Sequence, residues 1–263
     1  MNTLETIAHH CKQLRLSALA QTVPQAVELA TQEDWSLETF LDYLLEQEVS
    51  QRRQRRIERL LRQARLPANK TLDQFDQERL PLRVRRQMTW LTEGHFIHKA
   101  QNILIFGQPG TGKTHLAAAL SFEWVHRDFP VLFTPTFKLV DVLLRAKRDY
   151  LLEAELKRLD RFAVVVLDDI GYVQQSRDEM EVLFTFLAER YERRSVVITS
   201  NLVFSQWNQI FKDPLTTAAA IDRVVHHSRI IEFGADMVSV RAEHAAQRQL
   251  QLNQASEGSS AQS

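Results

Sequence analysis

The sequence predicts an α/β fold in which helices cover both faces of a parallel sheet as a three-layer sandwich, with a small all-helical domain in front of it. Residues 1–66 contain no glycine and carry apolar side chains at helical spacing. From Gln101 onward, short β-rich runs alternate with helix-like segments. With 44% hydrophobic residues in a chain of 263, there is enough apolar material for a packed core.

The longest helix expected in the first quarter begins at Ser36, whose hydroxyl suits an N-cap, and it has Glu38 in its first turn. Its apolar stripe consists of Leu37, Phe40, Leu41, Leu44 and Leu45. The helix is expected to run to Arg65, because Pro67 stops it. The charge changes sign along it, from an acidic first half to residues 51–65, which hold seven arginines against one glutamate.

Five strands are expected in the second part, at residues 102–106, 131–134, 162–168, 195–201 and 229–233. Helices are expected between them at residues 115–127, 137–149, 179–194 and 216–227. The predicted organisation is a helical N-terminal domain, a linker, an α/β domain and a disordered polar tail, at residues 1–66, 67–82, 83–253 and 254–263.

The overall charge excludes a global electrostatic attraction to DNA or membranes, since 33 basic residues balance 33 acidic ones. Any such affinity has to come from local segregation of charge. A single cysteine, Cys11, excludes an intrachain disulfide and fits a reducing compartment. The N-terminal residues lack a continuous apolar segment, so we expect a cytoplasmic protein that does not associate with membranes.

The octapeptide GQPGTGKT at residues 107–114 matches the P-loop pattern and contains three of the seven glycines in the chain. It follows an expected strand and precedes an expected helix, so backbone N–H groups and the helix dipole can converge on phosphate oxygens. Lys113 would neutralise the β- and γ-phosphates, and the Thr114 hydroxyl would ligate Mg²⁺. The alternative to a phosphate-binding loop is a glycine-rich turn that matches the pattern by chance. The ATP-binding residues expected here are Gly107, Pro109, Gly110, Thr111, Gly112, Lys113, Thr114 and His115.

Two carboxylates, Asp168 and Asp169, end the expected strand VVVLDD. Asp168 is expected to interact with Mg²⁺ through bound water, and Asp169 could orient and deprotonate the attacking water. Asn201 ends another strand and could hold that water, although an Asn after a strand is often a turn residue. A strand between the P-loop strand and the acidic strand distinguishes this layout from the Ras-like one.

Arg223 lies in AAAIDRVVHH, where neighbouring apolar residues could pack inward and leave its guanidinium pointing outward. It could pair with Asp222 or Asp178. It could instead reach the γ-phosphate of a neighbouring subunit as an arginine finger, which would make hydrolysis depend on assembly.

With these residues in view, the chain resembles the AAA+ ATPases of the initiator and helicase-loader branch, and most closely the IstB transposition helpers and their relative, the DnaC helicase loader. The resemblance spans KTLDQFD, FGQPGTGKTHLAAAL, VVVLDDIGY, VITSNLVFSQW, IDRVVHHSRIIEF and a terminal SVR. It implies that Arg223 is a finger acting in trans and that Arg241 occupies a sensor-2-like place. It also implies that ATP assembles the protein on duplex DNA to recruit or stimulate a transposase.

Two features depart from the family pattern. Asp169 stands where many AAA+ members have Glu, so the second acid is shorter by one methylene and slow hydrolysis is expected. After the last expected strand, 30 residues remain, which is too few for the usual helical lid. Arg241 could therefore act differently from a lid arginine or pair with Glu243.

Basic residues on two helices are candidates for DNA contact, and the alternative for both groups is a solvated helix surface. The first group is Arg52, Arg53, Arg55, Arg56, Arg59 and Arg62, and the second is Lys138, Arg145, Lys147 and Arg148. Such contacts would be salt-dependent and largely independent of base sequence. Histidines 9, 10, 226 and 227 form adjacent pairs on different helix faces, so no metal is assigned to them.

Three hypotheses follow. The first is an ATP-dependent, DNA-binding regulator of transposition that self-associates with ATP and uses hydrolysis as a release switch. The second is a DnaC-like loader of a replicative helicase. In the third, ATP is only a structural ligand and is not hydrolysed. The shorter acid at Asp169 is compatible with this hypothesis, because it favours slow hydrolysis.

Overall fold

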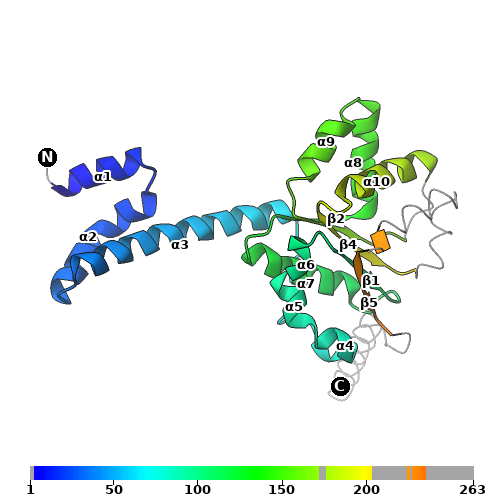
Figure 1. Cartoon of the computed structure of the whole chain (residues 1–263), viewed down its shortest axis with the longest axis horizontal. Coiled ribbons are helices and arrows are strands. Elements are labelled where there is room, and N and C mark those ends of the chain that lie inside the picture. The colour runs from blue at the N-terminus through cyan, green and yellow to red at the C-terminus, as the bar shows by residue number, and fades with distance from the viewer. Residues whose placement is uncertain (1–2, 172–175, 203–223, 226, 235–263) are drawn as a thin grey trace, which may run out of the picture. The chain divides into compact units, whose positions relative to one another are not determined.

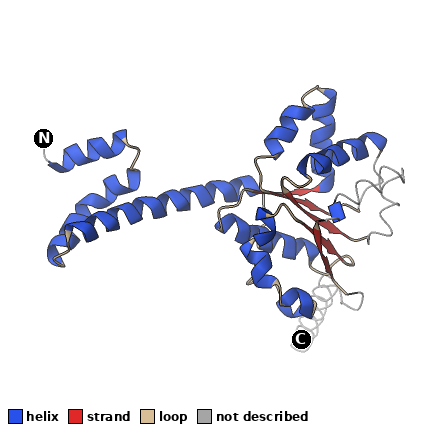
Figure 2. Ribbon diagram, in the orientation of Figure 1, coloured by secondary structure: helices blue, strands red, loops and turns tan. Residues whose placement is uncertain are grey.

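The computed structural model describes residues 3–171, 176–202, 224–225 and 227–234 (Figure 1). The chain divides into two compact units, Met1–Arg59 and Leu60–Ser263. The first is all-helical, and the second combines helices with a sheet (Figure 2). Within the described ranges, no helix has both the length and the apolar character required to span a membrane.

The N-terminal unit contains α1 (Thr3–Gln13), α2 (Ser17–Gln32) and the first part of α3 (Leu37–Ala64). Its small core consists of Val23, Ala26 and Leu44, against which partly buried side chains of all three helices pack. The predicted N-cap is confirmed, since the Ser36 hydroxyl accepts a hydrogen bond from the backbone N–H of Thr39 at 3.2 Å.

A buried glutamate joins α2 to α3. Glu48 is 4% exposed, and one of its carboxylate oxygens accepts the backbone N–H groups of Ala18 and Leu19 at 2.9 and 3.0 Å. Its other oxygen accepts Nε of Arg52 at 2.7 Å. Burial opposes ionisation of Glu48, but the hydrogen bonds from Arg52, Leu19 and Ala18 outweigh it and lower the pKa of the carboxyl. The charge therefore caps the start of α2.

The C-terminal unit is built on a five-stranded parallel sheet, and all five expected strands are confirmed. They are β1 (Asn102–Phe106), β2 (Val131–Pro135), β3 (Val164–Asp168), β4 (Ser195–Ser200) and β5 (Ser228–Glu232). Their order is β2-β3-β4-β1-β5, so β4 lies between the P-loop strand and the acidic strand, as the sequence predicts. The carboxyl ends of β1, β3 and β4 consequently share one edge.

Helices cover both faces of this sheet, which confirms the predicted α/β three-layer architecture (Figure 2). On one face, α8 (Thr136–Arg148), α9 (Leu152–Leu159) and α10 (Arg177–Arg190) enclose the main hydrophobic core with side chains of β1 to β4. On the other face, α7 (Lys113–His126) packs on the strands and α5 (Met88–Glu93) packs on α7. Trp124 is fully buried there, and its indole N–H donates to the Leu91 carbonyl at 2.7 Å.

Three of the four expected helices of this unit correspond to α7, α8 and α10. The fourth, at residues 216–227, lies mostly outside the described residues, and within it Val224 and Val225 are helical. Four short helices were not anticipated: α4 (Leu82–Arg85), α5, α6 (His95–His98) and α9. α4, α5 and α6 have six residues or fewer, so none of these three repeats an apolar position often enough to produce a periodic pattern. α9 has eight residues and does carry leucines at helical spacing, Leu152, Leu156 and Leu159, a signal that the sequence reasoning missed.

The segment expected as a linker, residues 67–82, lies within the C-terminal unit and has buried side chains. Phe75 is 9% exposed and Leu80 is 2% exposed. A short 3₁₀ helix, η1 (Gln77–Arg79), separates them, with its start capped by the Asp76 carboxylate. These apolar side chains anchor the segment to the unit that carries the P-loop.

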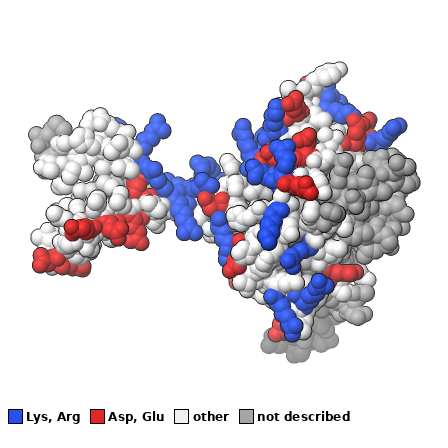
Figure 3. Space-filling view, viewed as in Figure 1, with Lys and Arg blue, Asp and Glu red and all other residues white. Residues whose placement is uncertain are grey.

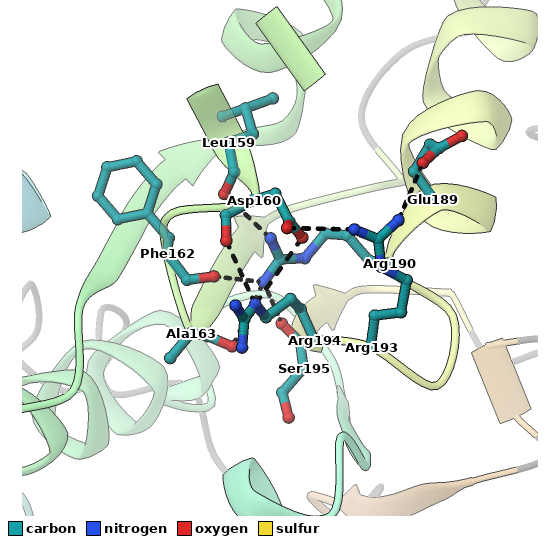
Figure 4. Close-up of polar contacts among 9 residues, drawn as sticks. All are labelled: Leu159, Asp160, Phe162, Ala163, Glu189, Arg190, Arg193, Arg194 and Ser195. Carbon is teal, nitrogen blue, oxygen red and sulfur yellow. Dashed lines mark hydrogen bonds and ion pairs between the residues drawn. The ribbon is translucent and has the colours of Figure 1, made fainter. Parts of the chain in front are cut away.

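Arg190 binds the amino ends of β3 and β4 together (Figure 4). It is 3% exposed, and its guanidinium donates to the carbonyls of Leu159, Phe162, Ala163 and Ser195 at 2.9–3.3 Å. Burial lowers its pKa to about 9, although the Asp160 carboxylate acts in the opposite direction. The guanidinium therefore stays charged at neutral pH and supplies hydrogen bonds to backbone carbonyls at the amino ends of the strands.

Candidate nucleotide-binding site

The P-loop connects β1 to α7 through backbone conformations that favour glycine. Gly107, Gly110 and Gly112 have φ values of 155°, 83° and 103°. A Cβ atom on Gly107 would lie 2.7 Å from the Cβ of Phe233, which is closer than side chains approach one another. The loop therefore requires glycine at this position, and the helix that follows directs its N-terminal N–H groups into the loop.

Lys113, the first residue of α7, is only 7% exposed and folds back over the loop. Its ammonium group donates to the carbonyls of Gly107 and Gln108, each at 2.8 Å. Thr111 is also buried, and its hydroxyl donates to the Gln108 carbonyl at 2.9 Å. The lysine charge is thus held inside the loop, where a phosphate would bind.

Thr114 and Asp168, the two residues expected to hold Mg²⁺, are in contact. The Thr114 hydroxyl donates to Oδ1 of Asp168 at 2.9 Å, although the two residues are 54 positions apart. The backbone carbonyl of Asp168 accepts the hydroxyl of the buried Thr136 at 3.1 Å. The parallel sheet causes the contact, because β1 and β3 end at the same edge and Thr114 lies at the start of α7, just after the loop that follows β1.

Asp169 and Asn201 also meet at this edge. The Asn201 side-chain amide donates to Oδ1 of Asp169 at 3.2 Å. Asp169 has a left-handed backbone with φ of 60°, a conformation that Asp tolerates better than most residues. The arrangement brings the proposed base next to the amide that was expected to orient water.

Thr199 is a residue of this site that sequence reasoning missed. It is 1% exposed on β4, and its hydroxyl donates to Oδ1 of Asp168 at 2.7 Å. The same hydroxyl accepts the backbone N–H of Asp169 at 2.8 Å. A hydroxyl inside the apolar run SVVIT was the available signal, because a buried polar group needs a partner.

His115, expected to contact ATP, has its ring against the segment before the sheet. Its Nε2 lies 3.0 Å from the Thr71 carbonyl oxygen, and its ring makes an edge contact with Phe75 at 5.2 Å between centroids. Phe75 also covers Gly112, where an added Cβ would be 3.2 Å from the Phe75 ring. Residues 71–75 therefore form one wall beside the P-loop.

The two arginines predicted to act on the γ-phosphate, Arg223 and Arg241, lie outside the described residues. Asp178, one alternative partner for Arg223, is 3.7 Å from the ammonium nitrogen of Lys147.

At least two of the six α3 arginines proposed for DNA contact bond within the N-terminal unit. Arg52 binds Glu48 and donates to the Arg15 carbonyl at 2.8 Å. Arg55 donates to the Ser17 hydroxyl at 2.6 Å. All six are exposed, and basic side chains gather along the second half of α3 in Figure 3. Arg52 and Arg55 therefore help to hold the unit together, a structural role that does not depend on DNA binding.

In the second basic group, two of four residues have acidic partners. Arg145 pairs with Asp141 at 2.6 Å, and Lys147 pairs with Glu181 at 2.8 Å. The hydrogen bond to Glu181 raises the pKa of Lys147. Lys138 and Arg148 are exposed. Acidic partners therefore compensate the charge of half of this α8 group.

Comparison with known proteins agrees with this geometry. The family model for the IstB-like ATP binding protein matches residues 9–247. An insertion sequence ATP-binding protein of Sinorhizobium fredii is 41% identical over 236 residues, which cover 89% of this chain and 79% of that protein. The insertion sequence IS21 ATP-binding protein of Pseudomonas aeruginosa is 35% identical over 249 residues, which cover 94% of this chain and 92% of the relative.

Solved structures show the same fold at low sequence identity. The DnaC helicase loader superimposes with a TM-score of 0.55 at 19% identity, over 64% of this chain and 98% of that chain. The replication initiator DnaA bound to AMPPCP and single-stranded DNA gives 0.55 at 16% identity, over 65% of this chain and 52% of that one. This chain has the AAA+ P-loop fold and belongs to the IstB-like ATP-binding protein family.

Proposed function

We propose that this protein is an ATP-hydrolysing, DNA-binding regulator of insertion-sequence transposition. The observation that carries the proposal is the contact between Thr114 and Asp168 at 2.9 Å, with Asp169 and Asn201 beside it. A site that only stores ATP has no need for a second acid joined to an amide. The insertion-sequence names of the relatives support the biological setting.

The side chains suit magnesium-bound ATP. Lys113 carries its charge into a glycine loop at a helix N-terminus, which is a site for phosphate. Thr114 and Asp168 offer hard oxygen donors at adjacent positions, and these would hold Mg²⁺. When bound, the metal would offset the charge of the phosphate oxygens.

Hydrolysis would depend on three further residues. Asp169 would accept a proton from the attacking water, and Asn201 would orient that water. Arg223 would act on the γ-phosphate held by a neighbouring subunit, so that activity follows ATP-dependent self-association. Arg241 would contact the nucleotide from its sensor-2-like position.

The N-terminal domain, residues 1–66, would contact duplex DNA or the partner transposase, and the ATPase domain, residues 83–253, would power assembly. DNA contact through arginines would be strongly salt-dependent and largely indifferent to base sequence. Hydrolysis would then weaken the assembly and release the DNA. For the helicase-loader hypothesis, the similarity to DnaC concerns the fold alone.

The test is the steady-state ATPase rate with and without duplex DNA, for the parent, Lys113→Ala and Arg223→Ala. We expect DNA to stimulate the parent, Lys113→Ala to lose activity, and Arg223→Ala to bind ATP but hydrolyse it more slowly. Phosphate release by the parent no faster than by Lys113→Ala would contradict the proposed enzyme activity. A parental rate for Arg223→Ala would contradict catalysis between subunits.

A further inference from the structure

Three arginines that the sequence analysis left unassigned lie together on α4 and the residue after it. Arg83, Arg85 and Arg86 are all exposed. Val84 on α4 and Met88, the first residue of α5, are buried at 8% and 7% exposure. Because these two apolar side chains face the core, the arginines extend into solvent.

A fourth arginine joins them from the edge strand β5. The Arg229 guanidinium carbon lies 3.9 Å from the centroid of the Trp90 ring, and Nη1 lies 3.4 Å from Oε1 of Gln87, the residue after Arg86. A guanidinium stacked on an indole has a restricted orientation, and its N–H edges stay available. We call Arg83, Arg85, Arg86 and Arg229 the α4 arginine surface. In Figure 3 basic side chains gather in the region that Figure 1 labels α4.

The charge of this surface is not compensated by ion pairs among the described residues. Two acids close to these arginines in the chain have other partners, since Asp76 pairs with Arg79 at 3.2 Å and Glu93 lies 2.9 Å from His95. The α8 group differs, because Arg145 and Lys147 have carboxylate partners there. In a chain of zero net charge, four uncompensated guanidiniums create a local positive field.

We propose that the α4 arginine surface binds the phosphate backbone of duplex DNA, an inference that rests on the proposed DNA-binding function. Guanidiniums bind phosphate oxygens through paired N–H groups, which suits phosphodiesters. A protein partner would call for an apolar centre, whereas Leu82 is the only large apolar side chain exposed on α4. Contacts to phosphate alone do not read base sequence.

The experiment measures fluorescence anisotropy of a labelled duplex with Mg²⁺ and ATP, over a series of salt concentrations. The test variant combines Arg83→Gln, Arg85→Gln and Arg86→Gln. The control combines Arg127→Gln, Lys157→Gln and Arg158→Gln, whose cations have acidic partners and whose charge change is the same. We expect the test variant to bind roughly ten- to a hundredfold more weakly, with a salt slope smaller by about 2 to 3.

The control is expected to keep the parental slope and an affinity within about threefold, because compensated surface cations contribute little. Thermal unfolding and binding of a fluorescent ATP analogue check that both triple variants fold. As a second variant, Arg86→Gln alone should lower the slope by about 1.

Equal DNA affinity and slope for the test variant and a DNA-binding parent would overturn this inference while leaving the proposed function intact. Equal weakening of test and control variants would overturn it as well, because the effect would then be one of overall charge. A parent that does not bind duplex DNA at saturating Mg²⁺ and ATP would overturn the proposed function, and this inference with it.

Discussion

Thr199 donates a hydrogen bond from Oγ1 to Oδ1 of Asp168 at 2.7 Å and accepts the backbone N–H of Asp169 through the same oxygen at 2.8 Å. One buried hydroxyl therefore contacts both adjacent acidic residues. Thr114 donates to the same carboxylate oxygen of Asp168, so two hydroxyls determine its orientation. Thr199 is a positioning residue for the proposed hydrolysis.

Replacing Thr199 by Val should lower kcat for ATP hydrolysis roughly ten- to a hundredfold, because hydrogen bonds to charged groups are worth about 1.5–3 kcal/mol. Thr199→Ser, which keeps the hydroxyl, should restore most of the activity. The measurement is steady-state kinetics at several Mg²⁺ concentrations. Equal losses in Val and Ser variants would mean that packing, rather than the hydrogen bond, explains the effect.

Asn201→Ala should lower kcat about a hundredfold or more and leave KM for ATP little changed. The reason is that Asn201 contacts Asp169 at 3.2 Å, whereas the P-loop residues that hold ATP stay intact. Steady-state kinetics measure kcat and KM, and binding of a fluorescent ATP analogue to the parent and to Asn201→Ala checks that the affinity for nucleotide is unchanged. Parental kcat in this variant would exclude a role for Asn201 in the chemical step.

Arg190→Ala should destabilise the C-terminal unit by about 3 kcal/mol, because four backbone carbonyls lose the same buried donor group. For a domain of this size, the melting temperature should fall by roughly 6–12 °C. Arg193→Ala is the matched control, since its side chain is 59% exposed and its pairs with Asp160 and Glu189 lie at the surface. Similar melting temperatures for the two variants would contradict this role for Arg190.

Glu48 should make the stability of the N-terminal unit depend on pH. Hydrogen bonds lower its pKa from the ordinary value of 4.5, so the unfolded chain takes up the proton first as pH falls. The stabilisation is present above pH 4.5 and is lost as pH drops through the lower folded pKa. Glu48→Gln should cost about 1–2 kcal/mol at pH 7 and progressively less in acid.

The check is the difference in unfolding free energy between parent and Glu48→Gln from urea titrations at pH 7 and below 4. The hydrogen bonds to Ala18 and Leu19 predict that this difference shrinks in acid. A difference independent of pH would show that the carboxylate charge is not what joins α2 to α3.

The strands and the P-loop could be predicted from the sequence because their signals are local. A strand buried on both faces is a continuous apolar run, and the phosphate loop needs glycine at fixed spacing. The start of α3 at Ser36 was predictable for the same reason, since a cap is a contact over three residues.

Short helices and contacts between distant residues could not be predicted in this way. α4 has four residues, too few to show a helical period, so its arginines gave no helical signal. Arg52 and Arg55 had the pattern of a DNA-binding face, yet their partners Arg15 and Ser17 are 37 and 38 positions away. Charge alone does not reveal whether a side chain already has a partner.

The sequence by itself determined that this chain folds as an α/β protein around a phosphate-binding loop, because apolar periodicity and glycine spacing act over a few residues. Only the tertiary structure decided which side chains meet at the end of the sheet. Thr199 and Thr114 reach Asp168 from 31 and 54 positions away, because the parallel strands β1, β3 and β4 end at a common edge and the loop after β1 carries Thr114 there at the start of α7. The structure likewise decided which arginines stay uncompensated, since ion pairing depends on the neighbours that folding supplies.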